Sequence, residues 1–299
     1  MAVINGYMLI ADISGYTAYL TTTELEHANP IILSLLKVLV EHMGEPLELW
    51  RLEGDAVMAY STDEAFPSGE TFLTICETLY NAFSALRLDI QANTDCPCRA
   101  CAQVPDLDLK ILVHHGPYEV VQIGPLRDIS GKDVILVHRM TKTNVREVTG
   151  VRSYALISDA AFKAMGSPKG MTPYVEPIKH FGDVQMQVYD LAAAWARHRA
   201  ARQRVYVPEA ESQLTLRARI PVPPASLWQI LVSANSKRQW VGLISVTVVS
   251  DDGRPGPGAE YHCVHDEMSF TSWVVDWEPF QYFSCRYLSP FKPHLSHFE

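Results

Sequence analysis

The chain has 299 residues, a length that fits two medium domains, and its 47% of hydrophobic residues exclude wholesale disorder. With 25 Lys and Arg against 34 Asp and Glu, the formal net charge is -9, which argues against nucleic acid as a partner because an acidic surface repels phosphate groups. No apolar run reaches the roughly 20 residues of a membrane helix, and the first residues lack a secretory leader pattern, so we expect a cytoplasmic protein without a membrane span.

The first two thirds of the chain alternate between predicted strands and helices. Apolar runs of strand length predict strands at 6–13, 47–52, 56–60, 109–115, 118–123, 153–157, 174–178 and 184–189. Segments with helical apolar spacing predict helices at 30–43, 68–92, 132–140 and 191–204, and a further helix after a cap at Ser158 or Asp159. The strands at 109–115 and 118–123 are predicted to form a hairpin through Gly116 and Pro117. This order of elements favours an α+β sandwich.

A domain boundary is predicted where the composition changes at 205–211, because this stretch breaks the preceding helical pattern. The chain then divides into residues 1–204 and 205–299. The second part predicts strands at 213–219, 243–249, 259–265, 269–277 and 282–287, with a short helix at 225–232.

Two aspartates stand at the ends of predicted strands, beside glycine. Asp12 precedes Ser14 and Gly15, and Asp55 follows Gly54. Two carboxylates on neighbouring strands supply the hard oxygen ligands that one or two divalent cations need. The alternative is that each aspartate only forms a turn.

Four motifs in order along the chain carry a resemblance to a known family. They are ADISGYT from residue 11, RLEGD from residue 51, VHHG from residue 113 and DISG from residue 128, and the last leads to Arg139. Together they resemble the catalytic domain of class III adenylate/guanylate cyclases over about residues 5–190. The resemblance implies a ferredoxin-like βαββαβ core, a head-to-tail homodimer, ATP or GTP as substrate, and a cyclic 3′,5′-monophosphate and pyrophosphate as products.

The resemblance assigns a role to three of the charged residues. Asp12 and Asp55 match the family's metal-binding aspartates, which hold Mg²⁺ or Mn²⁺, two ions in each site. These ions activate the ribose 3′-hydroxyl and neutralise the triphosphate. Arg139 matches the catalytic arginine that stabilises the transferring phosphate and that the partner subunit supplies.

Other positions of the site depart from the family pattern. Arg51 replaces the base-recognising lysine and Asp128 matches the other base-reading position, so ATP is only the default over GTP. Ile135 replaces the catalytic asparagine, and Phe181 replaces the triphosphate-binding lysine, for which Lys179 is the nearest substitute. Losing one transition-state donor commonly costs about 10²–10³ in rate. Two hypotheses therefore stand, an active nucleotidyl cyclase and a catalytically impaired regulatory or binding module.

Three cysteines lie within six residues of a loop, at Cys96, Cys98 and Cys101. Such a group suits a soft metal such as zinc, and reduced, unligated thiols are the alternative. A structural zinc site would need a fourth ligand from elsewhere, and the candidates are Cys76, His114 and His115. The two histidines also fit a packing or capping role. A similar cysteine insertion marks a subfamily of cyclase-like proteins.

The last hundred residues carry a second resemblance. The segments 214–231 and 238–243 are similar to the start of START-like, polyketide-cyclase-type domains. The resemblance implies a helix-grip fold, in which a curved sheet around a long final helix encloses a cavity for a hydrophobic small molecule. The aromatic residues that would line this cavity, or would merely fill a core, are Trp228, Trp240, Trp273, Trp277, Phe270 and Phe283. The expected closing helix does not follow by residue 299, so we expect this domain to be incomplete.

Overall fold

A computed structural model describes residues 3–65, 70–266, 268–288 and 295–298. The chain forms two compact units, Met1–Trp195 and Ala196–Glu299. This division falls inside helix α8 (Leu191–Ala201), whereas the domain boundary predicted from the sequence lies at residue 205. None of the helices in the described part of the chain is long and apolar enough to cross a membrane.

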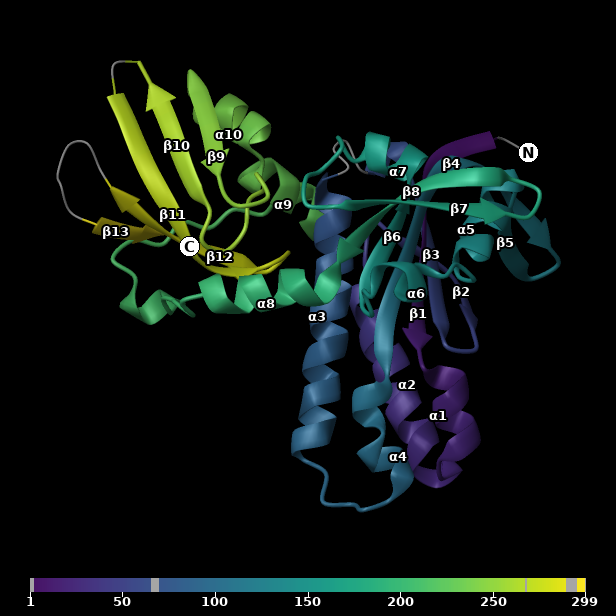
Figure 1. The fold of residues 1–299 in the computed structure, drawn as a ribbon. Coiled ribbons are helices and arrows are strands. Elements are labelled where there is room, and N and C mark those ends of the chain that lie inside the picture. The colour runs from purple at the N-terminus through teal and green to yellow at the C-terminus, as the bar shows by residue number, and fades with distance from the viewer. Residues whose placement is uncertain (1–2, 66–69, 267, 289–294, 299) are drawn as a thin grey trace. The chain divides into compact units, whose positions relative to one another are not determined.

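The first unit is built on one large mixed sheet (Figure 1). Its strands are β1 (Val3–Ser14), β2 (Glu48–Glu53), β3 (Ala56–Thr62), β4 (Asp108–Ile123), β5 (Leu126–Ser130), β6 (Tyr154–Ser158), β7 (Thr172–Ile178) and β8 (Gly182–Asp190). They lie in the order β2-β3-β1-β4-β6-β8-β7, and β5 pairs with β4. Only β4 and β6 run parallel among these pairs. The predicted α+β class is confirmed, and β2-β3-β1-β4 with its connecting helices has βαββαβ connectivity.

The helices of this unit follow the apolar spacing of the sequence. They are α1 (Tyr16–Thr22), α2 (Leu25–His42), α3 (Glu70–Ala92), α4 (Arg99–Ala102), α5 (Lys132–Met140), α6 (Val145–Thr149), α7 (Asp159–Ala164) and the start of α8, with 3-10 turns η1 (Asp63–Ala65) and η2 (Val104–Asp106). Helix α2 buries a face at Ala28, Ile32, Leu35 and Leu39, which is helical spacing. Ser158 caps α7, because its hydroxyl accepts from the Ala161 amide at 3.2 Å.

The predicted hairpin at Gly116 and Pro117 is wrong, because β4 runs through both residues as one strand of 16 residues. It pairs with β1 from Asp108 to Glu119, straight through both residues. On its other side, β4 pairs with β6 only as far as Val113 and with β5 only from Glu119. Pro117 lies in the gap between these two partners, where its missing amide proton costs no ladder hydrogen bond.

The second unit holds an antiparallel sheet with strands in sequence order (Figure 1). Its elements are η3 (Glu209–Glu211), α9 (Pro224–Val232), α10 (Ala234–Val241), β9 (Ser245–Val249), β10 (Glu260–His265), β11 (Met268–Glu278), β12 (Tyr282–Leu288) and β13 (Leu295–Phe298). The strand predicted at 213–219 is wrong, since no strand is assigned there. Leu214 and Leu216 are 75% and 86% exposed, so the alternating apolar residues of this segment have no sheet to cover.

The core of the second unit is aromatic. Trp228 meets Trp277 edge to face with ring centres 4.8 Å apart, and Phe283 lies 5.6 Å from Trp228. Trp228 and Trp277 therefore fill a core. Trp240, by contrast, is 53% exposed, whereas a residue that lines an enclosed cavity would be buried. The START-like fold itself stays a prediction.

One buried ion pair ties the segment after α8 to this sheet. Asp276 is only 1% exposed, and its carboxylate accepts from Arg202 and, at 3.0 Å, from the Tyr282 hydroxyl. Arg202 also pairs with Glu278 at 2.9 Å. Although burial raises the pKa of Asp276, these hydrogen bonds hold it below its usual value. The carboxylate is thus charged and fully partnered.

Candidate functional site

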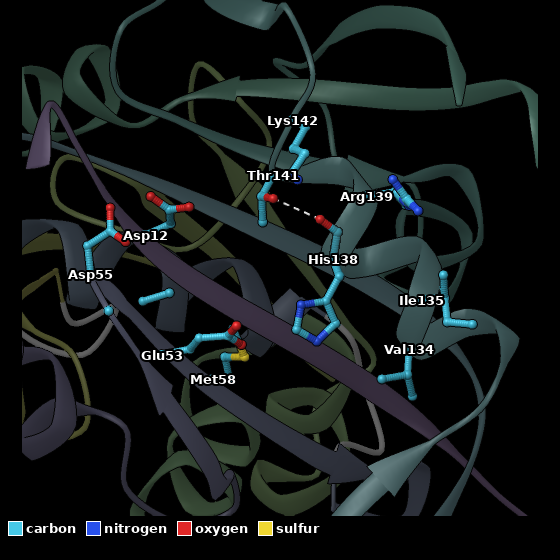
Figure 2. Close-up of a pocket in the computed structure, with 12 residues that line it drawn as sticks. Asp12, Glu53, Asp55, Met58, Val134, Ile135, His138, Arg139, Thr141 and Lys142 are labelled. Atoms are coloured by element: carbon cyan, nitrogen blue, oxygen red, sulfur yellow. Dashed lines mark hydrogen bonds between the residues drawn. The ribbon is translucent and has the colours of Figure 1, made fainter. Parts of the chain in front are cut away.

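A pocket of about 680 Å³ opens in the first unit where β1 and the β2–β3 turn face helix α5 (Figure 2). Its lining is Asp12, Glu53, Gly54, Asp55, Ala56, Met58, Val134, Ile135, His138, Arg139, Thr141 and Lys142. One wall is acidic and the opposite wall, with the loop that follows α5, carries basic groups. The pocket thus brings three of the residues singled out from the sequence, Asp12, Asp55 and Arg139, to one place.

Strand pairing places the two aspartates side by side. Asp12 is in register with Ala56, and the Ile13 amide donates to the Asp55 carbonyl at 3.1 Å. Gly54 adopts a positive φ of 61°, which lets the chain turn between β2 and β3 within two residues. Asp55 consequently stands at the tip of that turn and next to the end of β1. The two aspartates are thus close together, with Asp12 on β1 and Asp55 in the turn that leads into β3.

The surroundings of these carboxylates oppose their charge. Burial raises the pKa of Asp12 and of Asp55, and the negative charge of Asp55 adds to the effect on Asp12. Lys110 offsets this in part, with its Nζ atom 3.4 Å from Asp12 Oδ2 and donating to the Thr141 carbonyl at 3.0 Å. Two carboxylates facing one ammonium leave a net negative site of oxygen donors. This donor set fits a hard divalent cation such as Mg²⁺ or Mn²⁺.

Helix α5 supplies the opposite wall. His138 lies in the middle of the pocket, with its ring edge-on to Trp50 at 5.3 Å. Burial lowers the pKa of His138, so the ring is neutral at pH 7. In Figure 2, Arg139 lies on the other side of His138 from the aspartates. Ile135 is 53% exposed and adds an apolar side chain to the lining of the pocket.

The two predicted base-reading residues are paired with each other. The Asp128 carboxylate on β5 accepts hydrogen bonds from the Arg51 guanidinium and the Trp50 indole on β2, and from the Ile129 amide at 2.8 Å. Burial would raise the pKa of Asp128, but these donors hold it below its usual value. Arg51 and Asp128 are therefore adjacent, although neither is among the residues that line the pocket.

Lys179 is not brought to the pocket. It is exposed in the turn between β7 and β8, and Phe181 in the same turn packs against the core of the first unit. Lys142, which sequence reasoning missed, lines the pocket instead. The sequence could have indicated Lys142, because it follows Arg139 by three residues, just after α5.

The two histidines of β4 have structural partners. His114 is 3% exposed, with Nδ1 2.7 Å from Ser158 Oγ and Nε2 2.8 Å from Asp133 Oδ1. The arrangement has the residue types of a hydrolase triad, but the Ser158 hydroxyl is buried and caps α7. His115 lies 2.7 Å from Asp63. The structure gives the pair a packing role.

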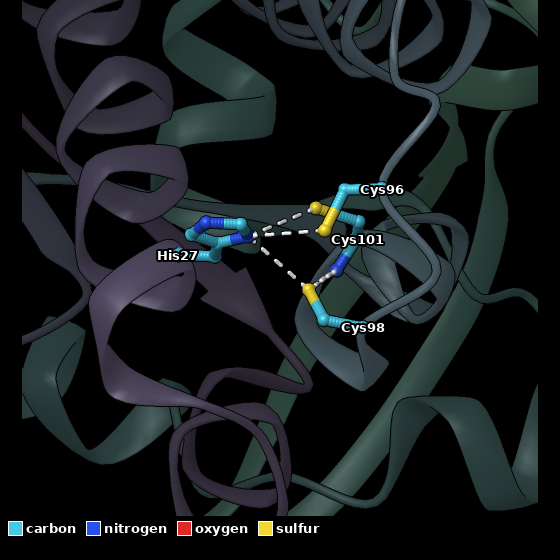
Figure 3. Close-up of side chains that lie close together, drawn as sticks. All are labelled: His27, Cys96, Cys98 and Cys101. Atoms are coloured by element: carbon cyan, nitrogen blue, oxygen red, sulfur yellow. Dashed lines mark hydrogen bonds between the residues drawn. The ribbon is translucent and has the colours of Figure 1, made fainter.

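A second group of side chains, none of which lines the pocket, converges around His27 (Figure 3). Cys96, Cys98 and Cys101 surround His27, whose Nδ1 atom lies 3.4, 3.2 and 3.6 Å from their Sγ atoms. The prediction that Cys76, His114 or His115 completes the cysteine cluster is wrong: Cys76 is buried in α3, and both histidines have other partners. The loop folds back onto the first turn of α2, a contact across about 70 residues that no local spacing reveals.

The surroundings of the cluster shift the pKa values of two of its thiols in opposite directions. A hydrogen bond from the Cys101 amide to Cys98 Sγ, at 3.4 Å, is the main cause that lowers the pKa of Cys98 to about 7. Burial and the neighbouring sulfurs raise the pKa of Cys101 to about 12.

Comparison with known proteins identifies similar chains. A family model described as a protein of unknown function (DUF2652) matches residues 32–149. "Uncharacterized protein Rv2561/Rv2562" of Mycobacterium tuberculosis (strain ATCC 25618 / H37Rv) is 28% identical over 153 residues, which make up 50% of this chain and 68% of that protein. The family match includes Asp55 and the three cysteines but begins after Asp12 and His27.

Solved structures of nucleotidyl cyclases are similar to the first unit in part. The adenylyl cyclase CyaB from P. aeruginosa has a TM-score of 0.46 and 15% identity, over 63% of this chain and 95% of that one. The guanylyl cyclase Cya2 has a TM-score of 0.46 and 12% identity, over 62% and 92%.

Proposed function

We propose that this chain binds a nucleoside triphosphate together with Mg²⁺ or Mn²⁺, as a protein of the class III nucleotidyl cyclase type. The observation that supports this most is the pocket itself, which is lined by Asp12 and Asp55 as well as by Arg139 and Lys142. A triphosphate needs both kinds of group, since carboxylates hold the cation and basic side chains contact the phosphates. The volume of about 680 Å³ falls within the roughly 300–1,000 Å³ of small-molecule sites.

Each side chain then has a task that follows from its chemistry. Asp12 and Asp55 would hold the metal ions, which lower the pKa of the ribose 3′-hydroxyl and screen the triphosphate. Arg139 and Lys142 would contact phosphate oxygens. The Arg51–Asp128 pair is proposed to meet the base, with ATP as the default nucleotide and GTP as the alternative. The resemblance to the family also proposes a head-to-tail homodimer. Arg139 lines the pocket of its own chain, and the family's arrangement, in which the partner subunit supplies this arginine, is the alternative.

A second candidate function is metal-dependent nucleotide binding without turnover. The exposed apolar side chain of Ile135 favours it, because the family places a hydrogen-bonding asparagine there. A single missing donor of this kind lowers the rate of comparable reactions by about 10²–10³.

Calorimetric titration with ATP and GTP, each with Mn²⁺ and with chelator, tests the binding proposal. We expect binding that requires the metal and that weakens about tenfold or more in Asp55→Asn, because one of two carboxylate ligands is lost. Asp183→Asn, at an exposed position of β8 outside the pocket, is the matched control and should bind like the wild type. Equal binding by wild type and Asp55→Asn would contradict the proposal.

An assay for cyclic nucleotide and pyrophosphate separates the two candidates. The cyclase hypothesis expects product above the Asp55→Asn background in the wild type. The binding-only hypothesis expects none in the wild type, with turnover appearing in Ile135→Asn because this substitution restores the donor.

A further inference from the structure

The cluster around His27 has the dimensions of a metal site. A zinc ion bound at about 2.3 Å by sulfur and about 2.0–2.1 Å by nitrogen sets N–S edges of about 3.5 Å in a regular tetrahedron. The three distances from His27 Nδ1 to the cysteine Sγ atoms are 3.2, 3.4 and 3.6 Å. All four donor atoms lie within 4.8 Å of one another. We propose that His27, Cys96, Cys98 and Cys101 bind one zinc ion in a closed tetrahedral site.

The chain around the cluster holds the donors in position without relying on the metal. The buried Tyr19 hydroxyl donates to the Ala100 carbonyl at 2.9 Å. The Glu24 carboxylate, at the start of α2, accepts from the Ala100 amide at 3.0 Å and from Arg99 at 3.3 Å. These bonds attach the backbone between Cys98 and Cys101 to α1, through Tyr19, and to the start of α2, through Glu24, in the turn that carries His27. The site is thus pre-organised by a shell of hydrogen bonds, as metal sites in proteins commonly are.

The ligand atoms of the cluster determine which kind of metal ion it can bind. Three thiolates and an imidazole suit Zn²⁺, whereas Mg²⁺ and Mn²⁺ prefer oxygen donors such as those of the pocket. The amide of Cys101 donates to Cys98 Sγ, which stabilises the thiolate form that binds a metal ion. Four protein ligands fill a tetrahedron and leave no position for water or substrate, so the site is structural and not catalytic.

The role of the zinc ion follows from what it joins. His27 belongs to α2, and the three cysteines lie on the connection between α3 and η2, which leads into β4. The zinc ion would cross-link this connection to α2. Since a structural zinc ion contributes directly to folding free energy, its removal should destabilise the first unit. This inference is independent of the proposed nucleotide site, because it uses none of the same residues.

Metal analysis of the full chain, purified after growth with added zinc and without chelator, is the first test. We expect close to one zinc per chain, and a loss of about tenfold or more in zinc content for Cys98→Ser and for His27→Ala. The matched controls are His42→Ala, at the other end of α2, and Cys263→Ala in the second unit, and both should keep their zinc. Zinc below about a tenth of an equivalent in the wild type, or full zinc in His27→Ala, would overturn the proposal.

Cobalt substitution gives a measurement that does not depend on the folding of variants. Zinc-free wild-type chain titrated with Co²⁺ should develop thiolate-to-cobalt charge-transfer bands and strong visible bands typical of tetrahedral coordination, complete at one equivalent. Mass spectrometry of the same protein should show all thiols reduced. A weak octahedral spectrum, or a disulfide between two of the three cysteines, would overturn the proposal.

Discussion

Burial disfavours the charged form of both pocket aspartates. Buried carboxylates with raised pKa values bind more protons in the folded chain than in the unfolded one. By linkage, folding stability therefore falls as pH rises through the window between the ordinary pKa of 3.8 and the raised values. At neutral pH the metal-free protein carries this penalty in full, and a bound divalent cation would remove it.

Replacing one of these carboxylates should stabilise the metal-free chain. We expect Asp55→Asn to raise Tm in chelator at pH 7 by on the order of 2 °C, because it removes a buried charge. Below the ordinary aspartate pKa the difference should vanish, since both carboxylates of the wild type are then protonated. With Mn²⁺ the order should reverse, because only the wild type keeps both ligands. Differential scanning fluorimetry at pH 7 and below pH 4 measures this, and a lower Tm of Asp55→Asn in chelator would contradict it.

The sequence predicts individual residues well where their position is set locally. Asp55 stands in a turn beside Gly54, which is a local feature of the sequence, and the pairing of β1 with β3 then brings Asp12 next to it. His27 could not be predicted as the fourth member of the cysteine cluster, because it meets Cys98 only through the tertiary fold. Lys179 was predicted from a weak register, and the structure leaves it on an exposed turn while Lys142 reaches the pocket.

At the scale of elements, two predictions from the sequence are wrong because strand pairing in the tertiary structure decides whether a segment forms a strand. Glycine and proline at 116 and 117 are typical of a turn, yet β1 pairs with β4 straight through them. Gly116 instead gives room to a neighbouring side chain: a Cβ atom there would lie 2.8 Å from Asp133 Cγ, so that Asp133 would have to shift. At 213–219, alternating apolar residues predicted a strand, but a strand needs a partner edge, and the sheet of the second unit is completed by later segments.

The ion pair between Arg202 and Asp276 should dominate the attachment of the segment after α8. Arg202→Met would leave the buried carboxylate uncompensated, which typically costs about 3–5 kcal/mol. Arg197→Met, at an exposed position of α8, is the matched control and should change the free energy of unfolding by less than about 0.5 kcal/mol. Urea unfolding followed by tryptophan fluorescence measures both, and similar losses in the two variants would show that the pair contributes little.

At the scale of the whole molecule, each unit has its own apolar core. The core of the first unit lies between its helices and the large sheet, and that of the second is centred on Trp228 and Trp277. The change in composition at 205–211 predicts a domain boundary in this region, whereas the two compact units divide inside α8. The order of the first unit's strands was harder to predict, because β6, β7 and β8 extend the sheet beyond the βαββαβ connectivity.

Separate cores predict that damage to one unit stays within it. We expect removal of zinc to increase hydrogen exchange in α2 and at 93–107, with the second unit unchanged, and Arg202→Met to increase exchange only in the second unit. When zinc is removed from Arg202→Met, the loss of stability caused by zinc removal and the loss caused by the substitution should add, because the two sites share no partner. Hydrogen-exchange mass spectrometry of the full chain measures amide exchange in each unit separately. Increased exchange in β11 and β12 on zinc removal alone would show instead that the two units unfold together.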